Sequence, residues 1–213
     1  MEFLMCGRYF LDLENDEIQK LIQSCAQKTD SEQVFSLQTG EIFPTDFAPV
    51  LTKNGACLMC WGFPRPNQKG VVINARIETA SEKPMFQGSL HAGLRCLIPA
   101  ARYFEWQAVS ASVKVKHEIY DPSSPTLYMA GLYRILRENN RPAFVILTRQ
   151  AAPNLSAIHS RMPVIPTKEQ AFLWLNGDPV ADLSQIRSLA SAPLHAAPKN
   201  AATTGQLSFF PQE

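Results

Sequence analysis

Apolar residues at helical spacing predict one helix near each end of the chain. Starting from Ile18, they recur at positions i, i+3, i+4 and i+7 within residues 12–27, and acidic residues fill the first turn. A second helix is expected over residues 168–175, with Asn176 and Gly177 ending it.

Short apolar runs between these helices predict strands, and the alternation of Val and Lys after residue 113 predicts a strand with one solvated face. The runs cover residues 48–52, 57–62, 71–75, 94–99, 103–107, 113–120, 127–135 and 143–148. Residues 28–46 are polar and turn-rich, and we expect residues 191–213 to be loosely ordered. Many short strands with few helices indicate an α+β fold, in which a curved, barrel-like, mainly antiparallel sheet is flanked by a few helices.

Composition fits one domain over residues 1–213 with a sizeable core, because 46% of the residues are hydrophobic and 18% are charged. The formal net charge of +1 (20 basic minus 19 acidic residues) excludes a non-specific polycation but leaves room for a local basic groove. No apolar stretch is long enough to span a membrane. The absence of a secretory signal and of a disulfide pattern predicts a reduced, cytoplasmic protein.

Cys57 and Cys60 form a Cys-x-x-Cys pair, which can mark a zinc or redox site. Zinc would need a second ligand pair at a suitable spacing, and a redox pair should begin a helix, whereas this pair lies in a predicted strand. We therefore expect ordinary buried cysteines, with no metal and no cofactor.

Met5 and Cys6 stand out because removal of the residues before Cys6 would leave a free N-terminal cysteine. Its α-amine, with a pKa of about 7.7–8.0, and its thiol, with a pKa of about 8.5, are both partly reactive near neutral pH. Together they can condense with an aldehyde and close a thiazolidine ring. Four residues precede Met5 in this sequence, so this chemistry depends on where the mature chain begins.

Three polar residues, Asn74, Arg76 and Glu78, are two positions apart and would share one face of an extended chain. They fit either a solvated strand face or a polar row along a cleft. Glu105 lies among three aromatic residues and is either exposed or desolvated, and desolvation would suit it to acid/base work. His159 and Arg161 lie in a loop before an apolar run that is bounded by prolines.

These segments together resemble the SRAP family, the SOS-response-associated peptidases or abasic-site processing proteins. The resemblance covers about residues 5–175, with residues 1–4 as an extension. The matching segments, in the order of the family, are Met5-Cys6-Gly7-Arg8-Tyr9, Pro44-Thr45, Trp61-Gly62, Ile73-Asn74-Ala75-Arg76-Ile77-Glu78-Thr79, Arg95-Cys96-Leu97-Ile98-Pro99-Ala100, Tyr103-Phe104-Glu105-Trp106 and Ile158-His159-Ser160-Arg161-Met162-Pro163-Val164-Ile165.

The resemblance implies a barrel-like α+β domain that senses abasic sites in single-stranded DNA and cross-links to them through an N-terminal cysteine, in the response to DNA damage. It implies an enzyme with cross-linking, lyase-type activity, and a monomer that is nucleoid-associated when bound to DNA. The catalytic residues that it implies are Cys6, Asn74, Glu105 and His159. The DNA-binding residues that it implies are Arg8, Arg76 and Arg161.

The chain departs from the family pattern in three places. Glu41 stands where the family usually has Asn, and residues 63–70 lack the tryptophans that some members use beside DNA. The usual Val-Asn stretch near the C-terminus is not clear in residues 194–205, where only Asn200 stands out. These departures concern DNA contacts and the edge of the site, and none of them removes a chemical residue.

Two other functions fit the same residues. A thiol autopeptidase would use Cys6 as the nucleophile and His159 as the base, and a non-catalytic reader would only bind single-stranded nucleic acid. The cross-linker needs a free α-amine on Cys6, the peptidase needs only the thiol, and the reader needs neither.

Overall fold

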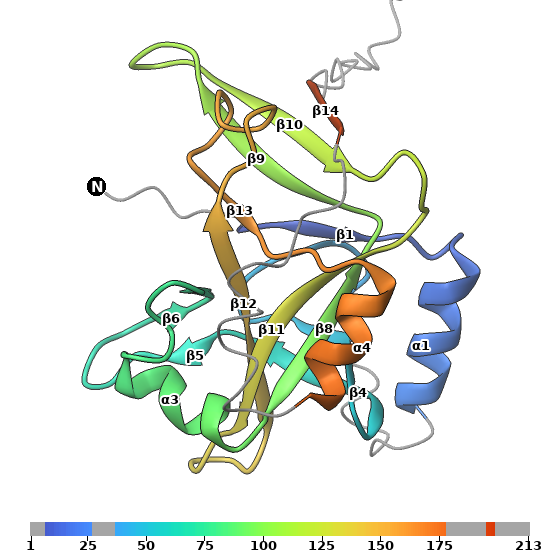
Figure 1. The fold of residues 1–213 in the computed structure, drawn as a ribbon, viewed down its shortest axis with the longest axis vertical. Coiled ribbons are helices and arrows are strands. Elements are labelled where there is room, and N and C mark those ends of the chain that lie inside the picture. The colour runs from blue at the N-terminus through green and yellow to red at the C-terminus, as the bar shows by residue number, and fades with distance from the viewer. Residues whose placement is uncertain (1–6, 27–36, 178–194, 199–213) are drawn as a thin grey trace, which may run out of the picture.

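The computed structural model describes residues 7–26, 37–177 and 195–198, so Cys6 and the extension before it lie outside the described part of the chain. Three helices in this part lie around the strands (Figure 1). They are α1 (Asp16–Ala26), α3 (Pro84–His91) and α4 (Lys168–Asn176).

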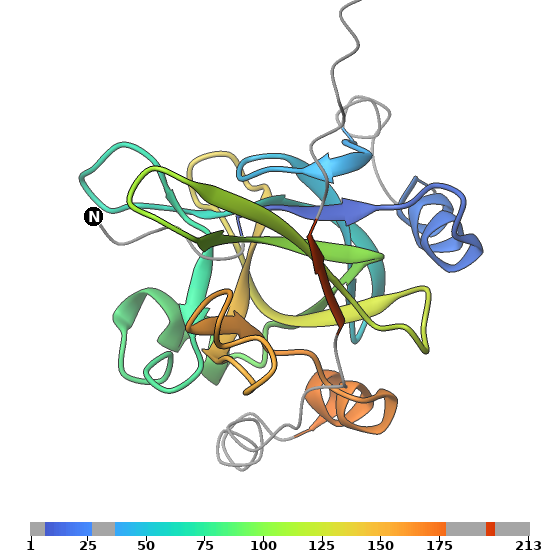
Figure 2. The same ribbon diagram turned by 90° about the horizontal axis from the view of Figure 1, so that it is seen from above.

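Five strands close into a ring at the centre of the structure, as the view from above shows (Figure 2). They are β3 (Phe47–Thr52), β4 (Gly55–Trp61), β8 (Arg95–Ala100), β11 (Leu127–Ile135) and β12 (Pro142–Gln150). Four antiparallel pairs, β4–β3, β3–β8, β8–β11 and β11–β12, are joined by the parallel pair β12–β4. The prediction of a barrel-like, mainly antiparallel sheet is therefore confirmed.

A second, antiparallel sheet lies at one end of this barrel, in the order β14-β10-β9-β1-β2 (Figure 1). Its strands are β1 (Tyr9–Leu11), β2 (Gly40–Ile42), β9 (Arg102–Ala108), β10 (Lys114–Tyr120) and β14 (His195–Pro198). β14 corrects the prediction of a loosely ordered tail for these four residues. Composition could not reveal it, because the strand forms by pairing with the free edge of β10.

Short strands extend β12 beyond the ring. β7 (Asn74–Arg76) pairs with it in parallel, and β13 (Arg161–Pro163) pairs with it antiparallel. β5 (Phe63–Pro64) and β6 (Val71–Val72) form a separate two-stranded ribbon. The single strand expected over residues 71–75 is thus divided, because β6 pairs with β5 and β7 pairs with β12.

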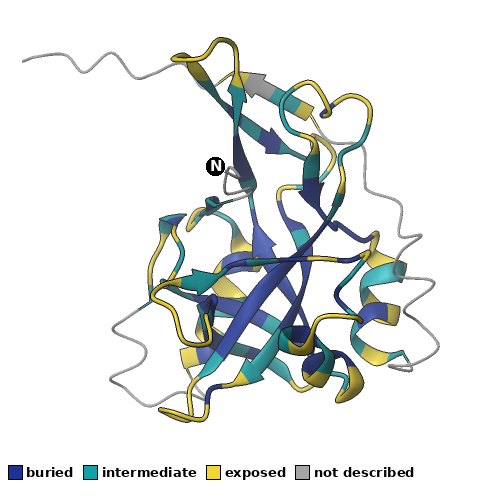
Figure 3. Cartoon of the chain, turned by 90° about the vertical axis from the view of Figure 1, so that its left-hand side faces the viewer, coloured by how far each residue is buried: buried dark blue, intermediate teal, exposed yellow. Residues whose placement is uncertain are grey.

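The buried residues concentrate in the barrel strands (Figure 3). The Trp61 ring stacks on Phe144 with 6.2 Å between centroids and contacts Tyr9 at 5.2 Å, so β4, β12 and β1 share one aromatic cluster. The indole N–H of Trp61 donates to the Ile73 carbonyl at 3.1 Å, which satisfies the one polar atom of a fully buried ring.

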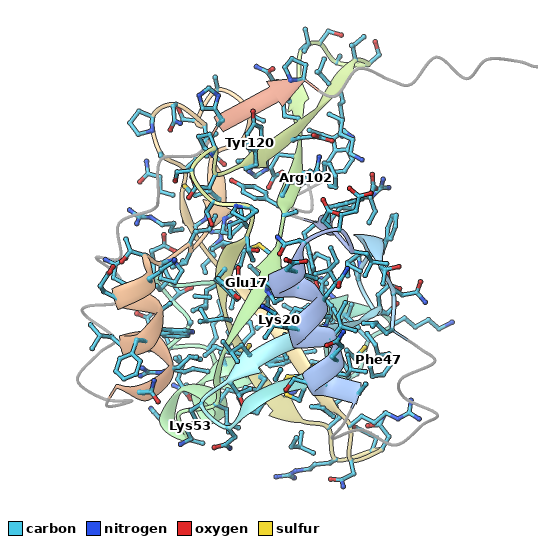
Figure 4. The ribbon with its side chains drawn as sticks, turned by 90° about the vertical axis from the view of Figure 1, so that its right-hand side faces the viewer. Glu17, Lys20, Phe47, Lys53, Arg102 and Tyr120 are labelled. Carbon is cyan, nitrogen blue, oxygen red and sulfur yellow. The ribbon has the colours of Figure 1, made fainter. Side chains whose placement is uncertain are left out.

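Two helices are fixed by polar contacts as well as by packing. Trp174 of α4 is buried and donates its indole N–H to the Cys96 carbonyl at 2.9 Å, and the Arg95 guanidinium lies 4.7 Å from the Trp174 ring centroid. The second helix, α1, packs against β3 and β4 and carries Glu17 and Lys20 (Figure 4). The Tyr128 hydroxyl donates to Glu17 Oε1 at 2.8 Å.

The predicted helix over residues 12–27 begins later than expected, at Asp16. Asp12 Oδ1 accepts the Glu14 N–H at 3.0 Å, and Asn15 Oδ1 accepts the Glu17 N–H at 2.9 Å, so side chains of the first residues form a turn and cap the helix. α3 was not predicted from the sequence, because its eight residues carry a Gly and a Ser and begin with Pro84.

We predict that Gly131→Ala lowers the free energy of unfolding by about 1–3 kcal/mol, because the added methyl overpacks the barrel. A Cβ at Gly131 would lie 2.5 Å from Ile98 Cδ1 and 2.6 Å from the Val145 carbonyl oxygen. Gly88→Ala is the matched control, since a Cβ there meets nothing within 4 Å and Ala favours a helix. Urea unfolding compares them, and equal midpoints for the two variants would contradict this packing.

Candidate active site

A cavity of about 780 Å³ opens between the second sheet and the loop that precedes β13. It brings together three of the residues expected at the site, Arg8, Glu105 and His159. Its wall consists of Gly7, Arg8, Phe43, Pro44, Glu105, Trp106, Ala108, Lys114, Ser156, Ala157, Ile158, His159 and Ser160. The chain enters this wall at Gly7, which is joined to Cys6 by one peptide bond.

Glu105 comes from the middle of β9 and is 3% exposed, so the structure decides between the two alternatives for this residue in favour of desolvation. Alternation along β9 puts its side chain on the same face as Tyr103, which is fully buried. A carboxyl group that lines a cavity and yet is almost hidden from water is suited to exchange protons with a bound molecule rather than with solvent.

His159 lies at the end of the loop and is held by its own backbone. Its ring Nδ1 accepts the Arg161 N–H at 3.1 Å, which assigns the proton of the neutral ring to Nε2. Burial lowers the pKa of His159, and the nearby positive charge of Arg161 lowers it further. The imidazole is therefore neutral near pH 7, with Nε2–H as its donor.

A side-chain relay connects this loop to the second sheet, and the loop lies beside β9 in Figure 1. Gln107 Nε2 donates to the Ala157 carbonyl at 3.1 Å, and Gln107 Oε1 lies 3.0 Å from His117 Nε2. His117 is opposite Glu105 in the β9–β10 register and is 8% exposed, and burial lowers its pKa. Gln107 and His117 thus position the loop that carries His159.

His117 is not among the site residues expected from the sequence. The signal was nevertheless present, because the alternation in residues 113–120 puts His117 on the same face as Val115 and Ile119. A His at an inward position of a strand needs a polar partner, and here Gln107 is that partner.

The Arg161 side chain is hydrogen-bonded to neighbouring protein groups. Its guanidinium makes two bonds to Glu78, of 2.6 and 2.7 Å, and a third to the Thr148 carbonyl at 2.8 Å. Hydrogen bonding to Arg161 lowers the pKa of Glu78. Arg161 therefore connects β13 to the end of β7 across β12, and its contact with DNA stays a prediction.

Asn74 and Arg76 lie on β7, as the predicted row requires, with Asn74 half-buried and Arg76 exposed. Neither of them is among the described residues that line the cavity. The row ends at Arg76, because a turn begins at Ile77 and Glu78 bends towards Arg161. The polar row thus lies beside β12, and the roles expected for Asn74 and Arg76 stay predictions.

A strained turn places Phe43 and Pro44 in the cavity wall. Thr45 has φ of +77°, which is unfavourable for a β-branched residue. The Thr45 N–H donates to the Trp61 carbonyl at 2.8 Å, and Asp46 Oδ2 accepts the Phe43 N–H at 2.8 Å. These bonds hold the turn in a conformation that the chain would otherwise avoid.

The two cysteines of the Cys-x-x-Cys pair lie in a strand, β4, as expected, but they are half-buried rather than buried. They are three residues apart in this strand and so point to opposite faces. The Cys60 thiol lies 3.3 Å from the Thr45 carbonyl oxygen, and burial raises its pKa. Both features disfavour a redox pair.

Within the described residues, no group of three or more His, Cys, Asp or Glu side chains could hold a metal ion. No helix in that part of the chain is long and apolar enough to cross a membrane.

We predict that His159 titrates below its ordinary pKa of 6.5, since burial disfavours the charged ring. The unfolded chain then takes up a proton before the folded chain does as the pH falls through 6.5, so acid lowers the free energy of unfolding. His159→Gln should lose less stability on acidification than the parent. An NMR titration of the imidazole, assigned with this variant, measures the midpoint, and a value at or above 6.5 would contradict the half-buried, neutral ring.

The family described as SOS response associated peptidase (SRAP) matches residues 5–203 of the chain. A solved protein of Bacteroides thetaiotaomicron superposes with a TM-score of 0.72 at 23% identity, over 92% of this chain and 93% of that one, which supports the fold alone.

Among its relatives, the abasic site processing protein YobE of Bacillus subtilis is 33% identical over 190 residues, which are 81% of this chain and 82% of YobE. The abasic site processing protein YedK of Escherichia coli is 32% identical over 118 residues, which are 54% of this chain and 52% of YedK. With the family match over most of its length, the chain belongs to the SRAP family.

Proposed function

We propose that this protein processes abasic sites in single-stranded DNA by forming a covalent thiazolidine cross-link through Cys6, once Cys6 is the first residue. The observation that carries the proposal is the cavity that begins at Gly7 and is walled by the buried Glu105 and the neutral His159. The names of the similar proteins from Bacillus subtilis and Escherichia coli, which call them abasic site processing proteins, support the same substrate.

The chemistry uses both nucleophiles of Cys6. The α-amine adds to the aldehyde carbon of the ring-opened abasic sugar, and loss of one water gives a Schiff base. The thiol then adds to the imine carbon while its proton passes to the nitrogen, and the new C–S bond closes the ring. The thiol is tethered beside the imine, so this second step costs little entropy.

Glu105 and His159 divide the proton transfers between them. Glu105 gives a proton to the departing hydroxyl during dehydration, a task suited to a carboxyl group held away from bulk water. His159 lines the cavity as a neutral ring. Its Nδ1 accepts the Arg161 N–H, and its Nε2–H can donate to a bound molecule. It assists opening of the sugar ring, or the reverse reaction.

DNA contacts follow the edge of the cavity. Arg8 stacks on Phe43 and Trp106, with its guanidinium carbon 4.6 and 5.1 Å from the ring centroids, and binds a phosphate that flanks the lesion. Phe43 is 40% exposed and offers a face for base stacking. Asn74 and Arg76 of β7 lie outside the cavity wall, and in this proposal Asn74 orients the sugar and Arg76 binds a second phosphate.

The Cys6 amine must be free for this reaction, because the lone pair of an amide nitrogen is delocalised into the carbonyl group. In the sequence as numbered, five residues precede Cys6. The active protein therefore lacks residues 1–5. Either translation starts at Met5 and Met5 is then removed because Cys6 is small, or cleavage removes residues 1–5.

A second candidate function, a thiol autopeptidase, is supported by the position of His159 in the cavity wall that begins at Gly7. To act as the base towards the Cys6 thiol, the neutral ring must move its proton from Nε2 to Nδ1 and give up the bond from the Arg161 N–H, which leaves Nε2 able to accept. Self-cleavage before Cys6 would then generate the free amine that the cross-linking reaction needs. The two functions would follow one another in the same cavity.

We predict that protein beginning at Cys6 forms a denaturant-resistant adduct with single-stranded DNA that contains an abasic site. Cys6→Ala should lose this durable adduct, because an imine without the thiol hydrolyses. Glu105→Gln should slow adduct formation by about 10²-fold or more while affinity for DNA is retained. Single-turnover gel assays give both values. An equally durable adduct with Cys6→Ala would refute the thiazolidine, and an unchanged rate with Glu105→Gln would remove Glu105 from the reaction.

A further inference from the structure

Three charged side chains meet on the outer face of the second sheet, at the edge of the cavity. Glu41 of β2 accepts bonds through both carboxylate oxygens, Oε1 from Lys116 Nζ at 2.5 Å and Oε2 from Arg8 Nη1 at 3.4 Å. Lys116 comes from β10, so these side chains meet across the two strands that separate β10 from β2. One carboxylate thus bridges two cations, much as two oxygens of a phosphate would.

The two cations are held in place independently of Glu41. Arg8 lies over the rings of Phe43 and Trp106, and Lys116 Nζ lies 3.9 Å from the Phe104 centroid and 5.6 Å from that of Trp106. Trp106 therefore contacts both cations. Because cation–π contacts do not depend on the carboxylate, the cationic pair keeps its arrangement when Glu41 leaves.

A ligand in the cavity reaches the cluster at Arg8. Arg8, Phe43 and Trp106 line the cavity wall, whereas Glu41 and Lys116 are not among its lining residues. The side chains of Arg8, Glu41 and Lys116 are 39%, 26% and 21% exposed to solvent, so water and a DNA backbone can reach them. Glu41 also belongs to β2, a three-residue strand at the edge of its sheet.

We propose that Arg8 and Lys116 form one phosphate subsite for single-stranded DNA, and that Glu41 occupies this subsite until a phosphate displaces it. The proposal rests on the proposed function, and it adds Lys116 as a binding residue and Glu41 as an internal competitor. Glu41 weakens binding to any strand and so favours strands that gain additional contacts in the cavity. Partly exposed ion pairs are weak, which makes this displacement feasible.

The chain offers a matched control for the charge of Glu41. Glu118 of β10 lies on the same sheet and pairs with Arg102, with Glu118 Oε2 3.3 Å from Arg102 Nη1. Its side chain is 19% exposed, comparable with Glu41, but it lines a different hollow together with Tyr120 and Arg102. Glu118→Gln removes the same charge from the same sheet without freeing the subsite.

The test measures affinity of the full chain for an undamaged single-stranded oligonucleotide by fluorescence anisotropy over a series of salt concentrations. Glu41→Gln should bind about three- to fivefold more tightly at low salt. Its plot of log K against log salt should steepen by at most about 0.7, the value for one phosphate contact, because an undamaged strand that leaves Glu41 in the subsite of the parent gains this contact in the variant. Adding Lys116→Ala to Glu41→Gln should abolish the gain, and Glu118→Gln should match the parent.

Unchanged or weaker binding by Glu41→Gln would overturn the proposal, as would an equal gain with Glu118→Gln, because that gain would reflect net charge alone. Glu41→Ala gives a second measure should the first variant fold poorly. Undamaged DNA forms no cross-link, so the result is independent of Cys6 chemistry. If the parent binds DNA without a gain in Glu41→Gln, only this proposal falls. If a gain appears without any cross-linking of abasic DNA, only the thiazolidine falls.

Discussion

Closure of the barrel by β12 is the constraint on which the rest of the structure depends. This strand pairs with β11 on one side and with β4 on the other, and its parallel contact with β4 completes the ring. Its residues from Ala143 to Thr148 are all buried, so hydrophobic burial and backbone hydrogen bonds both favour the same register. Gly131 contributes by letting β8, β11 and β12 approach each other closely.

The candidate site depends on the far end of the same strand. Beyond the ring, β12 binds β7 and β13, so that Thr148 lies opposite both Arg76 and Pro163. Arg161 bonds to Thr148 and Glu78, and its backbone N–H fixes the ring of His159. The pairing of β12 with β7 and β13 thus helps to fix the orientation of the His159 ring. The second sheet brings Glu105 to the same cavity.

Local patterns in the sequence predicted most of the strands and both longer helices, because alternation and helical spacing reflect burial directly. Among the site residues, motifs predicted Arg8, Glu105 and His159, which do share a cavity. The relay through Gln107 and the bridge made by Glu41 could not be predicted, since each depends on which strands become neighbours. The pairing of β14 escaped prediction for the same reason.

The central claim is that Cys6 reacts as an N-terminal residue at the cavity whose wall starts at Gly7. The most direct test is tandem mass spectrometry of the peptide that carries the remnant of the abasic sugar after digestion of the cross-linked protein. The account predicts a peptide that begins at Cys6, has bonded to the sugar with loss of one water, and has a thiol that no longer reacts with iodoacetamide. A cross-linked peptide that still contains Met1 to Met5 would contradict the account.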